Sequence, residues 1–184
     1  TFGNAVQPGN KAIYVQGNGN RRDVDVLVAA QYRKYTRFRS HADQSYVEGI
    51  TFWDSTGHQI VNYPKQHSTN CTDKHQSTTQ WFKPTVRILK NMRNRMIEDG
   101  ELADGIAPSY FLEGMLYNVP TNAFGTSYQD TMVNSINWLL KADRSSLLCA
   151  NRQYKLLHPT SRVTWRDEQF QTYLDAVVAY WKTW

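Results

Sequence analysis

Hydrophobic and polar residues follow two different periods along the chain, and the change falls near residue 80. Before residue 66, apolar and β-branched residues alternate with polar ones or form short runs, and turn-forming residues separate the runs, as at Gly17–Asn20. This pattern is typical of β-strands joined by hairpins. The predicted strands lie at Lys11–Val15, Asp23–Ala30, Ile50–Trp53 and Gln59–Tyr63, with Pro64 ending the last one.

From about residue 80, apolar residues recur every three or four positions, which is the period of an amphipathic helix. The first helix ends near Gly100, with Pro84 in its first turn, and the second is stopped by Pro120. Thr164 and Asp167 have the spacing of a capping box for the last helix. The apolar faces are Phe82, Val86, Leu89 and Met96; Phe111, Leu112, Met115, Leu116 and Val119; Met132, Val133, Ile136, Leu139 and Leu140; and Phe170, Tyr173, Leu174, Val177, Val178 and Trp181.

Strands followed by helices predict the α+β class. The polar residues 65–79 show no period and are expected to form a long loop. We therefore divide the chain into a β-rich part at residues 1–66 and a helical part at residues 67–184.

Composition excludes several classes of protein. With 184 residues, 40% hydrophobic and 20% charged, the chain can bury a core and is not intrinsically disordered. No apolar run approaches the ~18 residues of a membrane span, so we expect a soluble protein without a membrane partner. Two cysteines do not make a disulfide scaffold and fit the reducing cytoplasm.

The net charge of +5 is unevenly distributed. Residues 1–100 carry 14 Lys and Arg against 8 Asp and Glu, whereas residues 101–184 carry 7 against 8. A basic first half suits an anionic partner such as a phosphate, although an ordinary solvated surface has the same composition.

Two acidic residues stand at the start of an apolar strand. Asp23 and Asp25 are two positions apart, so their side chains are expected on one face of the strand. Carboxylates in such a place suit a hard cation such as Mg²⁺, which in turn binds nucleotide phosphates. The alternative is that one of them is a solvated turn residue.

The first helix carries Lys83, Arg87 and Lys90 at positions i, i+4 and i+7. This spacing aligns the three cations along one stripe, which could hold a triphosphate or be a solvated helix face. The next helix opens with Ser109 and Tyr110. A helix N-terminus offers backbone N–H groups to an anion, and a tyrosine beside it could stack on a base, but such a start is also common for structural reasons alone.

Two further segments have candidate chemistry. His67, Cys71 and His75 are possible zinc ligands, but three ligands at this spacing match no closed structural site, so a polar loop with incidental histidines is favoured. Residues 31–39 interleave aromatic residues with cations, as in proteins that bind single-stranded nucleic acid; a surface connection with snorkelling side chains has the same pattern.

Taken in order, these segments resemble the C-terminal two-thirds of a nucleotidyltransferase of the polymerase-β-like superfamily. The branch that the chain resembles is that of the bacterial cyclic-GMP–AMP-synthase-like and oligoadenylate-synthase-like enzymes. The resemblance covers nearly the whole chain. It rests on Gly9–Ile13, Asp25–Ala29, Gln31–Tyr35, Gly49–Phe52, Asn62–Pro64, His67, Asn70, Lys74, Phe82-Lys83, Val86–Lys90 and Pro108–Tyr110.

The resemblance implies roles for individual residues. Asp25 matches the third catalytic, metal-binding carboxylate of the family, and Asp23 is a neighbour without that role. Lys90 matches the lysine that contacts nucleotide phosphates, Ser109 the residue at the helix start that touches them, and Tyr110 the aromatic residue that stacks on a base. It also implies Mg²⁺ as cofactor, ATP, GTP or other NTPs as substrates, and cyclic or linear oligonucleotide second messengers of bacterial antiviral defence as products.

The family's Gly-Ser and Asp-x-Asp motifs lie upstream of everything in this chain. We therefore expect an incomplete mixed or antiparallel palm sheet (residues 1–66) followed by a helical, nucleotide-binding lobe (residues 67–184). Such a chain is expected to be catalytically incomplete, to lack the N-terminal part of its catalytic domain and to self-associate. The competing hypothesis is a non-catalytic nucleic-acid-binding or protein-interaction module that uses residues 31–39.

Overall fold

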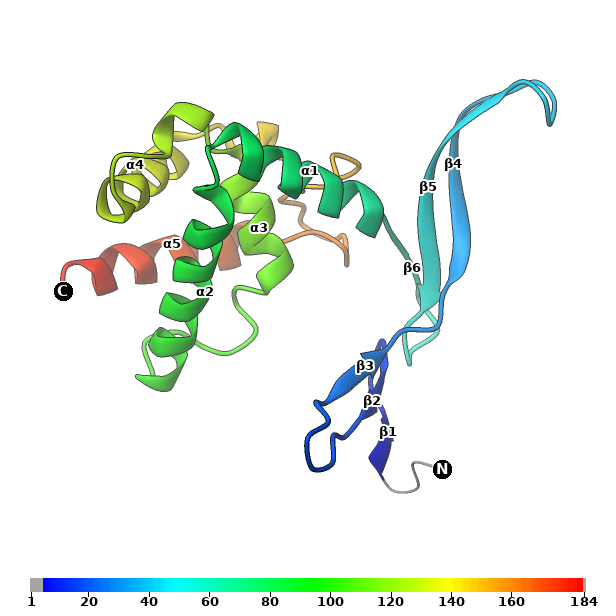
Figure 1. The fold of residues 1–184 in the computed structure, drawn as a ribbon, viewed down its shortest axis with the longest axis horizontal. Coiled ribbons are helices and arrows are strands. Elements are labelled where there is room, and N and C mark those ends of the chain that lie inside the picture. The colour runs from blue at the N-terminus through cyan, green and yellow to red at the C-terminus, as the bar shows by residue number, and fades with distance from the viewer. Residues whose placement is uncertain (1–4, 184) are drawn as a thin grey trace. The chain divides into compact units, whose positions relative to one another are not determined.

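The structure is a computed structural model that describes residues 5–183. The chain divides into two compact units, one running to Pro64 and the other from Lys65 to the C-terminus (Figure 1). The regular elements from Val6 to Asn62 are all strands. The helices follow them, beginning with α1 (Pro64–Ser77). The α+β class predicted from the periods is confirmed.

A small antiparallel sheet opens the first unit. Its strand order is β1-β2-β3, formed by Val6–Pro8, Ile13–Val15 and Val24–Val26. Register sets the two faces of this sheet: Ile13 lies opposite Val26, and Tyr14 lies opposite Asp25. Because side chains alternate along a strand, one face is apolar and the other carries Asp25. The predicted strand Asp23–Ala30 was too long, since β3 ends at Val26 and the chain then passes into the next sheet.

The second antiparallel sheet has the order β4-β5-β6, formed by Ala30–Phe38, Gln44–Trp53 and Gln59–Asn62. The hairpin predicted from residues 50–53 and 59–63 is confirmed. Strand β5 is longer than expected because its residues from Gln44 to Thr51 also pair with β4. The basic aromatic segment at residues 31–39 is therefore a strand rather than an irregular connection. Phe52 and Ile60 are buried apolar side chains of this sheet, and Tyr63, which follows β6, is buried as well.

Four helices of the second unit follow the predicted apolar faces. They are α2 (Phe82–Glu98), α3 (Ser109–Asn118), α4 (Tyr128–Lys141) and α5 (Asp167–Trp181), with the short 3₁₀ turns η2 (Thr121–Ala123) and η3 (Arg144–Ser146) between them. Leu89 and Met96 of α2, Leu116 of α3 and Leu174 of α5 are fully buried in their common core. The irregular segment before α5 adds Trp165, whose indole N–H donates to the Ile106 carbonyl at 2.7 Å.

The predicted loop at residues 65–79 is wrong: Pro64–Ser77 form helix α1. Its buried or half-buried residues recur at helical spacing but are polar, which hides the period from a hydrophobicity pattern. Asn70 donates to the Ala150 carbonyl at 2.7 Å, and Lys74 donates to the Val119 carbonyl at 2.5 Å. The helix is thus held by hydrogen bonds more than by apolar packing, and Cys71 is its one buried residue.

The predicted capping box of the last helix is also wrong. Arg166 is the N-cap residue of α5, and no side chain caps the helix. The Thr164 hydroxyl instead donates to the Ser161 carbonyl at 3.4 Å, so it belongs to the preceding turn. Among residues 5–183, no helix combines the length and the hydropathy of a membrane-spanning segment.

Candidate functional site

A pocket of about 300 Å³ opens between the first three helices of the second unit. One wall carries cations and the opposite wall carries a carboxylate, an imidazole and a thiol, a convergence of polar groups typical of binding sites. The lining residues are His67, Ser68, Cys71 and Thr72 of α1, Phe82, Lys83, Val86, Arg87 and Lys90 of α2, and Glu113 of α3.

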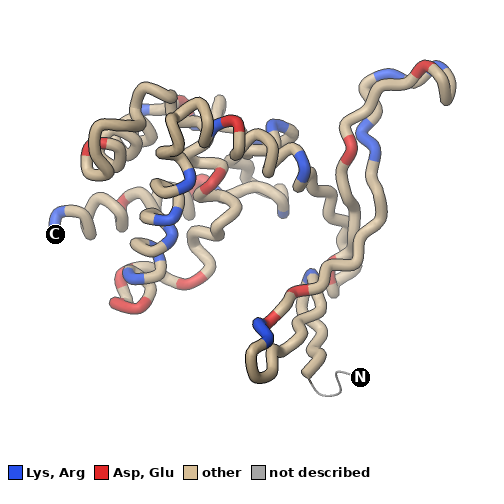
Figure 2. Tube along the Cα trace, viewed as in Figure 1, with Lys and Arg blue, Asp and Glu red and all other residues tan. Residues whose placement is uncertain are grey.

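The cationic wall is the stripe predicted from spacing. Lys83, Arg87 and Lys90 all line the pocket, because residues four and three positions apart share one face of α2. Blue segments follow one another along this helix in Figure 2. Lys83 and Arg87 are exposed, whereas Lys90 is half-buried. Two exposed charges and one half-buried, paired charge therefore face the same space.

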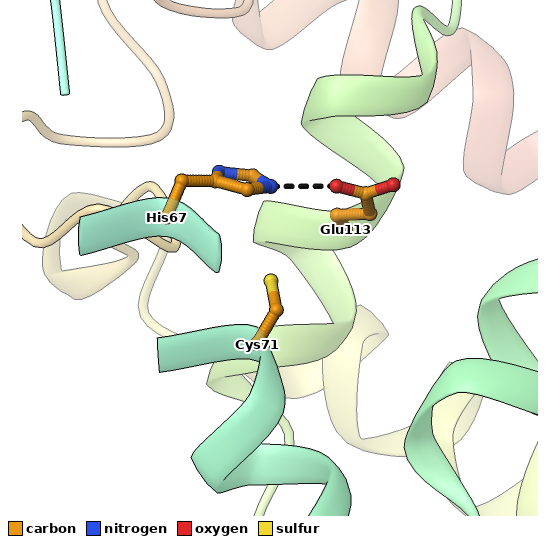
Figure 3. A group of neighbouring side chains, drawn as sticks. All are labelled: His67, Cys71 and Glu113. Carbon is orange, nitrogen blue, oxygen red and sulfur yellow. Dashed lines mark hydrogen bonds and ion pairs between the residues drawn. The ribbon is translucent and has the colours of Figure 1, made fainter. Parts of the chain in front are cut away.

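Glu113 lies at the centre of the opposite wall and was not identified from the sequence. Its Oε1 accepts a hydrogen bond from Lys90 Nζ at 2.5 Å, and its Oε2 lies 2.6 Å from His67 Nε2 (Figure 3). Burial opposes ionisation of this carboxyl, but the hydrogen bonds from His67 and Lys90 outweigh it and lower its pKa. The only sequence signal was that Glu113 is the single charged residue of α3.

Cys71 lies one helical turn from His67, with its sulfur directed toward the space beside the His67–Glu113 pair (Figure 3). The ligand atoms of His67, Cys71 and Glu113 all lie within 4.8 Å of one another. Burial, reinforced by the charge of Glu113, raises the pKa of the Cys71 thiol to about 12. His75, the third member of the group considered from the sequence, is not part of this cluster.

The reason is helical geometry. His75 lies eight positions after His67, so its side chain is turned by roughly 80° about the helix axis and lies about 12 Å further along the helix. His75 Nδ1 instead accepts a hydrogen bond from the backbone N–H of Lys83 at 3.4 Å.

Ser109 and Tyr110 begin α3, as predicted, but neither lines the pocket itself. The Ser109 hydroxyl accepts a hydrogen bond from Arg93 at 3.3 Å. The Tyr110 ring stacks on the His67 imidazole, with 4.6 Å between centroids and 20° between planes. Its hydroxyl accepts a hydrogen bond from Asn151 at 2.8 Å, and burial raises its pKa. One face of the ring predicted to stack on a base is thus in contact with an imidazole.

Asp25 belongs to the first unit and is exposed on β3. Its neighbour Asp23 lies just before this strand and accepts the backbone N–H of Gly17 at 2.8 Å. That hydrogen bond, followed by one from the Tyr14 hydroxyl, lowers the pKa of Asp23. The two aspartates therefore have different surroundings: Asp23 stabilises the turn between β2 and β3, and Asp25 faces solvent.

The basic aromatic segment is exposed along β4. Tyr35 contacts the edges of Phe38 and Tyr46, and the Arg33 guanidinium lies 4.5 Å from the centre of the Tyr46 ring. Arg37 pairs with Asp43 at 2.5 Å, so part of the positive charge is neutralised within the hairpin.

Comparison with known proteins adds a family. Residues 69–182 match the profile of the cGAS/DncV-like nucleotidyltransferase C-terminal helical domain. The chain is 44% identical over 161 residues to the cyclic UMP-AMP synthase of Rhodothermus marinus, covering 87% of this chain and 55% of that synthase.

Two solved structures are similar over almost the whole chain. The CdnE c-UMP-AMP synthase of Rhodothermus marinus with Apcpp and Upnpp superimposes with a TM-score of 0.89 at 40% identity, covering 99% of this chain and 61% of that one. The CdnE cyclic dinucleotide synthase of Elizabethkingia meningoseptica with GTP and Apcpp superimposes with a TM-score of 0.83 at 31% identity, covering 98% and 65%. This chain thus spans less than two thirds of the length of each of these relatives.

Proposed function

Since the chain belongs to the cGAS/DncV-like nucleotidyltransferases and carries their C-terminal helical domain, we propose that its pocket binds the triphosphate of an NTP. The enzyme concerned joins NTPs into cyclic or linear oligonucleotide second messengers of bacterial antiviral defence, in the cytoplasm. One observation carries the proposal: Lys83, Arg87 and Lys90 line a single pocket. Converging cations stabilise the charge of a polyphosphate, particularly where the site is partly desolvated.

Lys90 is the central phosphate contact in this proposal. Its ammonium group is held by the Glu113 carboxylate at 2.5 Å, so an arriving phosphate competes with Glu113 for the same cation. Lys83 and Arg87 are exposed and can turn toward the phosphates without breaking such a pair. Ser109, at the start of α3 and outside the pocket lining, is a further proposed phosphate contact, with Arg93 as an additional cation at its hydroxyl.

Tyr110 is the proposed platform for a base. Because His67 covers one face of the ring, a base stacks on the other face or displaces the imidazole. Base–aromatic stacking is worth about 1–3 kcal/mol and tolerates different bases, so this contact would hold a nucleotide without selecting one.

Asp25 is the proposed catalytic carboxylate and Mg²⁺ ligand. Its carboxylate is of the type that Mg²⁺ prefers, and it is exposed, so it fits as one ligand. Among residues 5–183, the only group of three potential His, Cys, Asp or Glu ligands lies elsewhere, so Asp25 supplies one ligand rather than a complete site. Bound Mg²⁺ would neutralise charge on the phosphates.

The test is binding of a non-hydrolysable NTP analogue to the chain and to Lys90→Ala. Losing a charge-assisted contact of about 1.5–3 kcal/mol weakens binding by about 10–150-fold. Lys182→Ala, a cation outside this pocket, is the matched control and should bind like the wild type. Equal losses in the two variants would refute the assignment of Lys90.

The second candidate function is binding of single-stranded nucleic acid by residues 31–39. The exposure of Tyr35 and Phe38 among cations on β4 favours it. Phe38→Ala should then weaken binding of an oligonucleotide by about 5–150-fold without changing the affinity for the NTP analogue. The two candidates are therefore separable in one pair of titrations.

A further inference from the structure

We propose that His67, Cys71 and Glu113 bind a zinc ion. The inference goes beyond nucleotide binding and does not depend on it, because it rests on the three side chains of one wall of the pocket. Their ligand atoms lie within 4.8 Å of one another, two of them on the same helix and the third on the helix packed beside it (Figure 3).

The spacing on α1 suits a metal ion. His67 and Cys71 are four residues apart, so their side chains leave the same face of the helix one turn apart. Two ligands at positions i and i+4 of one helix are a recurrent arrangement in zinc sites. No change in the backbone of α1 is needed to bring this pair to one ion.

The donor set points to zinc rather than to a harder cation. A thiolate, an imidazole and one carboxylate oxygen are all zinc ligands, whereas Mg²⁺ and Ca²⁺ prefer oxygen alone. In a tetrahedral site, ligand atoms about 2.0–2.3 Å from the ion lie roughly 3.3–3.6 Å from one another. His67 Nε2 and Glu113 Oε2, now 2.6 Å apart, separate by less than 1 Å to admit it, and the Cys71 sulfur approaches through side-chain torsions.

Zinc binding changes the protonation of two of the three side chains. The ion replaces the hydrogen bond between His67 Nε2 and Glu113 Oε2, so that Nε2 offers its lone pair and its proton moves to Nδ1. The Cys71 thiol loses its proton to solvent and binds as the thiolate. Glu113 Oε1 keeps its partner, the Lys90 ammonium, and so the carboxylate is shared between zinc and lysine.

The surroundings hold the imidazole but leave the site open. Tyr110 stacks on the His67 ring at 4.6 Å, which fixes its plane. Three protein ligands leave the fourth position to a small molecule, and the pocket of about 300 Å³ gives that position access to solvent. His67 Nδ1 is buried without a hydrogen-bond partner among the described residues. We therefore expect the affinity for zinc to be about 10–100-fold below that of a site in which the second imidazole nitrogen is hydrogen-bonded.

The experiment is titration of the chelator-treated full chain with Zn²⁺ in competition with a chromophoric chelator. A parallel titration uses Co²⁺, which reports ligation by its absorption. One ion per chain is expected, with a thiolate-to-cobalt charge-transfer band. Cys71→Ser should abolish that band, and His67→Gln and Glu113→Gln should each weaken zinc binding by at least about tenfold. His67→Gln retains both cysteines, so the result does not depend on whether Cys71→Ser folds, which circular dichroism checks.

The matched control is His75→Gln, which removes a histidine from the same helix but outside the cluster. It should bind zinc as the wild type does. The proposal is overturned if the wild type binds no zinc at micromolar concentrations, if no thiolate band forms with Co²⁺, or if His75→Gln weakens binding as much as His67→Gln. None of these outcomes bears on nucleotide binding by Lys90, which is measured separately.

Discussion

At the scale of single residues, Asp23 and Asp25 show how two neighbouring carboxylates acquire different roles. The backbone N–H of Gly17 and the Tyr14 hydroxyl engage Asp23, which therefore belongs to the turn before β3. Asp25 lies in β3 and is exposed. Both carboxylates are exposed, but Asp23 is already hydrogen-bonded within its own turn and is therefore the poorer metal ligand of the two.

If Asp25 holds Mg²⁺ as proposed, Asp25→Asn should lower kcat of the active enzyme by orders of magnitude, because a neutral amide replaces an anionic ligand of the ion. Asp23→Asn should cost at most about 10–100-fold, the effect typical of a residue behind the ligands. Steady-state assay of pyrophosphate release compares the two. The reverse order of effects would assign the metal-binding role to Asp23.

Asp54 contributes to the stability of the first unit in a pH-dependent way. The hydrogen bonds from the Thr56 hydroxyl and from the backbone N–H groups of His58 and Thr56 lower its pKa from 3.8 to about 2. A carboxyl group whose pKa is lower in the folded chain than in the unfolded chain stabilises the fold. This contribution is complete above the pKa of the unfolded chain and disappears as the pH falls from about 4 to about 2. Asp54→Asn should be less stable at pH 7 and lose this dependence.

Urea unfolding of the wild type and of Asp54→Asn between pH 7 and pH 2 measures this contribution. Asp73→Asn, which removes an exposed carboxylate on α1, is the control and should keep the wild-type dependence. An unchanged pH profile in Asp54→Asn would mean that the turn carries no acid-linked stability.

The candidate site was partly predictable at this scale. Lys83, Arg87 and Lys90 were found because helical spacing alone fixes which side chains share a face. Glu113 was missed because its partners lie 46 and 23 residues away, and only packing of α3 against α1 and α2 brings them together. Periodicity contains no information about such contacts.

At the scale of elements, α1 and β4 explain where the sequence pattern failed. Both present polar residues to their neighbours or to solvent, so neither has the apolar stripe from which elements are predicted. The four helices with apolar faces were located correctly. An element whose partner is a backbone carbonyl, as for Asn70 and Lys74, becomes apparent only in the folded chain.

Gly49 lies where β5 passes close to the backbone at the end of β6. A Cβ atom at this buried position would lie 2.7 Å from the Asn62 carbonyl oxygen and 2.9 Å from the Tyr63 ring. Because a backbone atom cannot move aside cheaply, Gly49→Ala should lower the free energy of unfolding by about 1–3 kcal/mol. Thermal unfolding measures it, with Gly19→Asn as a control in open space. Equal melting temperatures for Gly49→Ala and the wild type would contradict this packing.

At the scale of the whole molecule, burial is unequally divided between the two units. The helical unit encloses most of the fully buried residues, whereas the sheet β1-β2-β3 leaves apolar side chains in solvent. Val24 and Val26 lie on the same face, and Ile13 is paired with Val26 across the sheet. Their exposed fractions are 51%, 44% and 39%.

We therefore expect the 184-residue chain to self-associate through this face, with a second copy as the partner. Light scattering over a range of concentrations should show a mass that rises above the monomer of 21.4 kDa. Val24→Ser combined with Val26→Ser should reduce the association, and Val133→Ser, an exposed valine of α4, should not. A monomer at every concentration would exclude this face as an interface.

Glu113 is a single carboxylate that serves both an imidazole and an ammonium group. Because one side chain serves two partners, we expect substitutions at positions 67, 90 and 113 to depend on one another in the family. A neutral residue at 113 leaves the half-buried cation at 90 without its partner, whereas loss of that cation leaves a half-buried negative charge. A substitution of Lys90 alone or of Glu113 alone is therefore destabilising. Related sequences should change these residues together, as a correlated set.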